Sequence, residues 1–124
     1  GNIGVDAILN SKISLAIHNG IPVDYKATVP KETTVTDIDL CVVIGNLIDN
    51  AVESCEKVPK EQQFIRLYIG QFKEQLYISV SNATNETVRK LDEEYITHKR
   101  GNHGHGLKRI NEAGVFVTEI MLPL

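Results

Sequence analysis

The clearest periodic stretch of the sequence is TDIDLCVVIGNLIDNAVESCEK, residues 36–57. Its apolar residues recur every three or four positions, which places their side chains on one face of an α-helix. They are Leu40, Cys41, Ile44, Leu47, Ile48, Ala51, Val52 and Cys55. Thr36 followed by Asp39 resembles a capping box, the pattern of a helix N-terminus. Val58-Pro59 then ends the periodicity, so we predict one amphipathic helix over 36–57.

Shorter patterns lie on both sides of this helix. Residues 2–18 have helical spacing and stop at Asn19-Gly20. Ile21 to Val29 alternates as a strand, with Ile21, Val23, Tyr25, Ala27 and Val29 on one side. Residues 63–70 and 75–82 alternate around a short polar turn and predict an antiparallel hairpin.

The C-terminal part contains a predicted short helix, Leu107 to Glu112, and a last strand, Val115 to Leu122. Helices together with hairpin strands predict an α+β fold, a two-layer α/β sandwich with a mixed, largely antiparallel sheet. At 124 residues the chain is long enough for one domain with one hydrophobic core.

Composition narrows the partners and the compartment. The net charge of -3 does not favour nucleic acid or an anionic membrane as the main partner, because both require a basic surface. Cys41 and Cys55 lie about 21 Å apart along one predicted helix, so they cannot pair with each other. Free thiols, together with the lack of a signal peptide and of an apolar run long enough for a membrane helix, predict a cytoplasmic domain.

The predicted central helix also carries a polar stripe. Asn46, Asp49, Asn50 and Glu53 follow one another at helical spacing, so they share one side of the helix. Their side-chain oxygens suit a hard cation such as magnesium, which prefers oxygen ligands. The alternative is that the stripe is the solvent face of an ordinary amphipathic helix.

A second candidate site is His103-Gly104-His105-Gly106-Leu107-Lys108. Paired glycines before a helix allow the backbone to approach a ligand, and the free amides of a helix start favour phosphate. An ordinary loop-to-helix junction is the alternative, and the flanking cations Lys99, Arg100, Lys108 and Arg109 have the alternative of a solvated surface. A zinc site built from His98, His103 and His105 is weakly supported, since no cysteine lies nearby.

These two motifs together resemble those of the GHKL ATPase superfamily. NLIDNAVES is similar to its N box, GHGLKRI to its second glycine box, and VFVTEIMLPL to the closing strand of a kinase domain. Within the superfamily, the sequence most resembles sensor histidine kinases of the peptide-quorum-sensing type. Glu53 stands where other kinases often have Lys, and LYISVSNATN stands where they have the adenine-reading Asp-x-Gly-x-Gly box.

The resemblance implies a Bergerat-type fold that binds ATP and magnesium. Asn50 would hold magnesium between the phosphates with Asn46 beside it, and both would act in phosphate transfer. Asn82 would contact adenine, and Ala83 to His103 would cover the nucleotide as a lid. The remaining implied nucleotide-contacting residues are Asp49, Glu53, Gly104, His105, Gly106, Leu107 and Lys108.

The resemblance also implies a γ-phosphate transfer to a histidine on a separate dimerisation domain, with a response regulator downstream. The chain would then be the cytoplasmic part of a membrane-bound receptor, without membrane contact of its own. His18 ends a predicted helix and is not expected to be the acceptor, so the fragment should not phosphorylate itself.

Two departures from the family pattern leave other functions open. The first glycine box is absent, and the connection from GLKRI to the last strand is short, where kinases usually have a longer helix and another strand. A kinase-like docking module without nucleotide binding is therefore one alternative. An ATPase of the chaperone or mismatch-repair type fits less well, because an amide at Asn46 cannot act as a general base. A structural domain with coincidental motifs is the third alternative.

Overall fold

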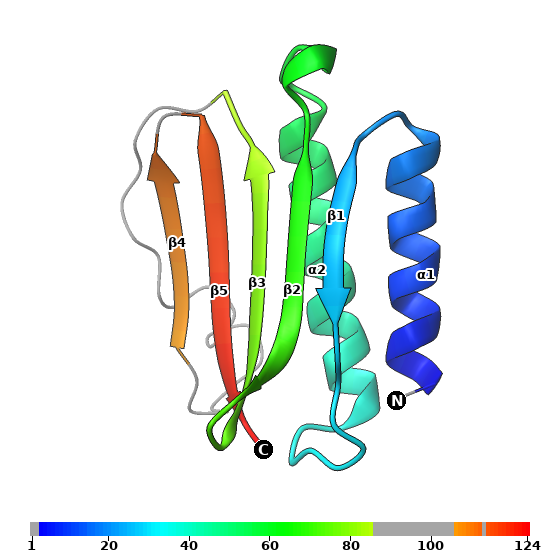
Figure 1. Ribbon diagram of the computed structural model, residues 1–124, viewed down its shortest axis with the longest axis vertical. Helices are drawn as coiled ribbons and strands as arrows, with labels where there is room; N and C mark the ends of the chain where they lie inside the picture. The colour runs from blue at the N-terminus through cyan, green and yellow to red at the C-terminus, as the bar shows by residue number, and fades with distance from the viewer. Residues whose placement is uncertain (1–2, 86–105, 113) are drawn as a thin grey trace.

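The computed structural model describes residues 3–85, 106–112 and 114–124 (Figure 1). The elements, in chain order, are α1 (Ile3–His18), β1 (Val23–Ala27), α2 (Asp37–Cys55), the short 3-10 helix η1 (Lys60–Gln62), β2 (Ile65–Phe72), β3 (Gln75–Ala83), β4 (Gly106–Glu112) and β5 (Val115–Pro123). None of the helices in these ranges is long and apolar enough to cross a membrane.

The strands form one five-stranded sheet in the order β1-β2-β3-β5-β4. β1 pairs with β2 in parallel, and the other three pairings are antiparallel. Figure 1 shows α2 on one face of the sheet, behind β2 in this view, and α1 beside β1. The predicted α+β class, with a mixed and largely antiparallel sheet, is confirmed.

The core lies between α2 and one face of the sheet. Alternate residues of β2, β3 and β5 point to this face, and they are almost fully buried: Ile65, Leu67, Ile69, Leu76, Ile78, Val80, Ile120 and Leu122. The apolar stripe of α2 covers them, while α1 adds Val5, Leu9, Ile13 and Ala16. Each Ile or Leu removed from water stabilises the fold by about 1.5–3 kcal/mol.

The predicted helix ends are present. The Thr36 side chain accepts a hydrogen bond from the Asp39 amide at 3.2 Å and so caps α2. After α1, Gly20 adopts a φ of +84°, which few other residues tolerate. Its amide bonds to the Ile17 carbonyl and the Ile21 amide bonds to the Ala16 carbonyl, the Schellman pattern. Ile21 is buried there and fixes the entry into β1.

The predicted helix over Leu107 to Glu112 is wrong, because Gly106–Glu112 is the strand β4. It pairs with β5 from Gly106 opposite Met121 to Glu112 opposite Val115. Gly114, with a φ of +85°, supplies the left-handed conformation beside the turn. A six-residue helix gains little by itself, whereas pairing along β5 satisfies a whole row of backbone groups.

The predicted strand after α1 is present as β1, but its residues on one side are not equally covered. Ile21 and Val29 are buried, whereas Tyr25 is 52% exposed. β1 is an edge strand of the sheet, so its neighbours cover only part of it. The period of two gives the side on which a residue lies, and the position of the strand in the sheet decides whether that side is covered.

Candidate functional site

The predicted polar stripe lies on the exposed side of α2. Asn46, Asp49, Asn50 and Glu53 are all exposed, while Leu47, Ile48 and Ala51 between them are buried. The helix therefore presents a row of oxygen-bearing side chains outside the core. Exposure alone is compatible with a ligand site and with an ordinary solvent-facing side of the helix. The contacts of each residue are needed to distinguish these two interpretations.

Asp49 has a partner on the other helix. Lys12 Nζ of α1 lies 2.8 Å from Asp49 Oδ1 and 3.0 Å from Oδ2. At 3.6 residues per turn, Asp49 points about 60° from Asn46 toward α1, whereas Asn50 points about 40° to the opposite side. The stripe thus divides into a carboxylate held by α1 and an amide pair directed away from it.

Glu53 lies on the α1 side of the helix together with Asp49, and not with Asn46 and Asn50. A hollow of about 280 Å³ between the two helices is lined by Lys12, Leu15, Ile48, Asp49, Val52 and Glu53. Neither Asn46 nor Asn50 lines it. The structure therefore brings the two acidic members of the stripe to the α1 side, apart from the two asparagines.

Asn82 lies near the end of β3, on the face of the sheet that α2 covers. It is only 3% exposed, and its Nδ2 donates to the Ala83 carbonyl at 2.8 Å. This bond fixes the amide so that Oδ1 is left as the acceptor, and Oδ1 bonds to no other described residue. A buried amide with an available acceptor can recognise a donor on a ligand.

The end of β3 lies alongside the last turns of α2. Ser54 Oγ is 3.4 Å from Thr84 Oγ1, and both elements run in the same direction in Figure 1. Asn50 lies four residues before Ser54, about 6 Å back along the helix. Asn82 lies two residues before Thr84, about 7 Å back along the strand. The amides of Asn50 and Asn82 are therefore at about the same level of the two layers.

Thr118 was not predicted as a site residue. It is 6% exposed and lies on β5 opposite Val80, one diagonal position from Asn82 on the same face. Its hydroxyl adds a polar group beside the Asn82 amide at an otherwise apolar layer. The sequence contains a signal for it, because Thr118 shares the buried period of Ile120 and Leu122 while being polar.

The glycine motif does not have the predicted geometry. Gly106, Leu107 and Lys108 are the first residues of β4. The helix start expected to bind phosphate over 107–112 is therefore absent, because a strand has no such row of converging amides. The phosphate contacts of these residues stay a prediction. Gly104 and His105 lie outside the described residues, as do His98, His103 and the predicted lid from residue 86 onward.

A metal cluster or a reactive thiol would require particular side chains among the described residues. No group of three or more His, Cys, Asp or Glu side chains converges within the described ranges. Both cysteines are free thiols, and burial raises the pKa of Cys55, whose Sγ lies 3.6 Å from the Phe64 carbonyl oxygen. Cys55 is therefore a packing residue rather than a nucleophile.

The sequence matches the model of the GHKL domain over residues 35–118, which includes α2, Asn82 and Thr118. The chain belongs to the GHKL domain family. No curated protein sequence gives a significant match.

Solved structures that resemble this fold include histidine kinase catalytic domains. The nucleotide-free catalytic domain of histidine kinase ThkA superposes with a TM-score of 0.73 at 15% identity, covering 99% of this chain and 92% of that one. The histidine kinase domain of the Erythrobacter litoralis EL346 blue-light-activated kinase gives 0.71 at 14% identity, covering 97% and 59%. ThkA in complex with the response regulator TrrA gives 0.67 at 15% identity, covering 96% and 40%.

The described residues of this GHKL domain are compatible with a magnesium nucleotide. Asn46 and Asn50 supply amide oxygens of the kind that magnesium accepts, and neither bonds to another described residue. Asp49 is less suited to the cation, since Lys12 already neutralises its charge. Asn82 supplies an acceptor for an amino group at the same level of the fold.

Proposed function

We propose that this GHKL domain is the ATP-binding catalytic domain of a bacterial sensor histidine kinase. In this proposal it transfers the ATP γ-phosphate to a histidine on a separate dimerisation domain, and a response regulator acts downstream. The supporting observation is that Asn50 of α2 and Asn82 of β3 lie at about the same level of the two layers, and that the acceptor of Asn82 is available there.

Each residue has a defined task in this proposal. Oδ1 of Asn82 accepts a hydrogen bond from the adenine amino group and orients the base. Asn46 and Asn50 hold magnesium, which when bound offsets the negative charge of the phosphates. Lys12 keeps Asp49 turned toward α1, so that this carboxylate does not repel the nucleotide phosphates. The domain then acts mainly by positioning the γ-phosphate.

Calorimetric titration with Mg-ADP tests the nucleotide site directly. Asn50→Ala and Asn46→Ala should each weaken Mg-ADP binding by about 10- to 100-fold, because each removes a ligand to a charged group. Asn10→Ala is the matched control, since Asn10 is an exposed asparagine on α1. Circular dichroism should show the same fold for all variants.

Two outcomes would contradict the proposal. A flat titration of the unmodified chain with Mg-ADP would favour the docking module instead. Equal affinities for the Asn50→Ala and Asn10→Ala variants would remove the central helix from the site. A separate experiment concerns the phosphate transfer. His18 ends α1 and is not expected to be the acceptor, so incubation with labelled ATP should leave no stable phosphate on this chain.

A further inference from the structure

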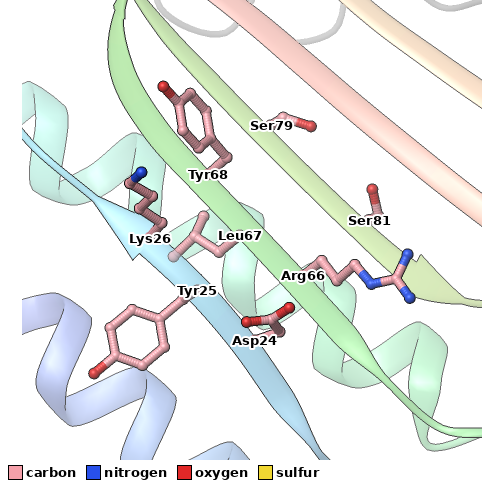
Figure 2. A pocket seen from close by; sticks show the side chains of 8 residues that line it. All are labelled: Asp24, Tyr25, Lys26, Arg66, Leu67, Tyr68, Ser79 and Ser81. Atoms are coloured by element: carbon pink, nitrogen blue, oxygen red, sulfur yellow. The ribbon is translucent and has the colours of Figure 1, made fainter.

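The sheet has a second face that none of the described helices covers. A hollow of about 240 Å³ lies on it. Figure 2 shows the side chains that line this hollow, with α2 behind the sheet. Its outward-facing lining comes from three neighbouring strands: Asp24 and Lys26 of β1, Arg66 and Tyr68 of β2, and Ser79 and Ser81 of β3.

The strand register places these six residues in two rows across the sheet. One row is Asp24, Arg66 and Ser81, and the other is Lys26, Tyr68 and Ser79. The four outer residues are exposed at the rim, while the two serines are half-buried on the third strand. Two cationic groups, an aromatic hydroxyl and aliphatic hydroxyls therefore surround one shallow space.

The two side chains of β2 are held in place by their neighbours. The guanidinium of Arg66 lies 5.2 Å from the centre of the Phe64 ring. The Tyr68 ring lies over Gly70, where an added Cβ would be 2.5 Å from the Tyr68 hydroxyl oxygen, and its centre is 5.9 Å from that of Tyr77. Tyr77 is itself fixed by a hydrogen bond to Glu119. Such support reduces the entropy lost when a ligand binds.

The charges select the kind of ligand. Neither Lys26 nor Arg66 forms an ion pair with another described residue. Asp24 lies opposite Arg66 and leaves the hollow with one net positive charge. One positive charge and several donors suit a carboxylate, whose two oxygens match the Arg fork, better than a doubly charged phosphate.

The size of the hollow indicates how the carboxylate is presented. At about 240 Å³ it is smaller than the roughly 300–1,000 Å³ pockets that enclose whole small molecules. It is therefore better suited to side chains of a larger partner, which would extend over the surrounding sheet. Tyr68, 43% exposed at its rim, is of a residue type enriched at protein interfaces.

We propose that this hollow is a docking site for an acidic segment of a partner protein. Glu or Asp side chains of that segment would approach it at Arg66 and at Lys26, whose charged ends point to opposite sides of the hollow in Figure 2. The proposal does not depend on nucleotide binding, because α2 and the asparagines lie on the other face of the sheet. Failure of one proposal therefore leaves the other standing.

The test uses the full chain and a short fluorescent peptide that alternates Glu and Ser, with a Gln-Ser peptide as its neutral counterpart. Binding is measured by fluorescence anisotropy, and the amide signals that shift on titration are mapped by NMR. Arg66→Gln and Lys26→Gln should each weaken Glu-peptide binding about two- to fivefold, the range for exposed charge pairs. Asp24→Asn should strengthen it by a similar factor.

Two further variants separate a built site from general charge attraction. Lys31→Gln removes the same charge from an exposed position outside the hollow and should have no effect. Gly70→Ala changes no charge but displaces the Tyr68 ring, and it should weaken binding as Arg66→Gln does. Shifted amides should lie in β1, β2 and β3 around the hollow.

Three results would overturn the proposal. Equal losses for Lys31→Gln and Arg66→Gln would indicate non-specific attraction. Equal binding of the Gln peptide would exclude carboxylate recognition. Inorganic phosphate or glutarate that binds the hollow as tightly as the Glu peptide would identify a small-anion site instead of a docking site.

Discussion

Replacing Asn82 by Asp tests the adenine contact most sharply. In the nucleotide-bound state, the bond from the adenine amino group would change from a neutral to a charge-assisted one. Net contributions are about 0.5–1.5 kcal/mol for neutral bonds and about 1.5–3 kcal/mol for bonds to charged groups. A gain of about 1 kcal/mol corresponds to about fivefold tighter Mg-ADP binding, and Asn82→Ala should be about fivefold weaker.

The same change should make the nucleotide-free protein less stable. Asn82 is 3% exposed, and its Nδ2 donates to the Ala83 carbonyl at 2.8 Å. A carboxylate cannot donate a hydrogen bond to the Ala83 carbonyl oxygen, so this oxygen would face a buried negative charge. We expect the free energy of unfolding to fall by about 1–3 kcal/mol. Tighter binding combined with lower stability is an outcome that a purely structural role for Asn82 does not predict.

Calorimetry with Mg-ADP and Mg-GDP, well below the unfolding temperature, measures the first effect, and urea unfolding measures the second. Guanine has an oxygen where adenine has its amino group, so Asn82→Asp should not improve Mg-GDP binding. Asn10→Asp is the matched control, because Asn10 is an exposed asparagine on α1 outside the proposed nucleotide site. Equal Mg-ADP affinities for Asn82→Asp and Asn82→Ala, or an equal gain for Mg-GDP, would refute the assignment.

Three other predictions concern the fold. Thr36→Ala removes the α2 cap and should lower the free energy of unfolding by about 1 kcal/mol in urea, whereas Thr36→Ser should change it little; equal losses would contradict the cap. The half-buried Cys41 should react with Ellman's reagent before the buried Cys55, whose pKa is raised by burial. The Cys55→Ser variant retains only Cys41 and the Cys41→Ser variant retains only Cys55, and equal reaction rates in the two variants would argue against this. Burial and the Glu119 carboxylate raise the pKa of Tyr77 above its ordinary value, so its contribution to stability is complete below about pH 10 and is lost as pH rises further; Tyr77→Phe should flatten this alkaline loss, and an unchanged pH profile would contradict it.

The predictions that held describe features with local causes. α2 was located from its period and its Thr36 cap, and the hairpin of β2 and β3 from alternation around a polar turn. The four polar residues of α2 lie on one exposed side as predicted, since helical spacing alone fixes this. The spacing did not reveal that Lys12 holds Asp49, because the two residues are 37 positions apart in the chain.

The prediction that failed concerns a segment whose structure is set by a distant partner. Gly106–Glu112 contains a glycine followed by residues compatible with a short helix, but β5 offers it a continuous row of backbone partners. Local preference is worth only tenths of a kcal/mol per residue, whereas pairing satisfies many backbone groups together. The helix-start amides expected to bind phosphate are absent with that helix.

The amino-acid order by itself determined which residues of α2, β2 and β3 face the core, where α2 begins, and which polar residues share one side of α2. These features follow from the repeat of the backbone. Only the tertiary structure decided that Asn82 lies level with Asn50, that Thr118 joins it, and that Arg66, Lys26 and the serines surround one hollow. These relations depend on strand order and register, which are set by packing and pairing between segments far apart in the chain.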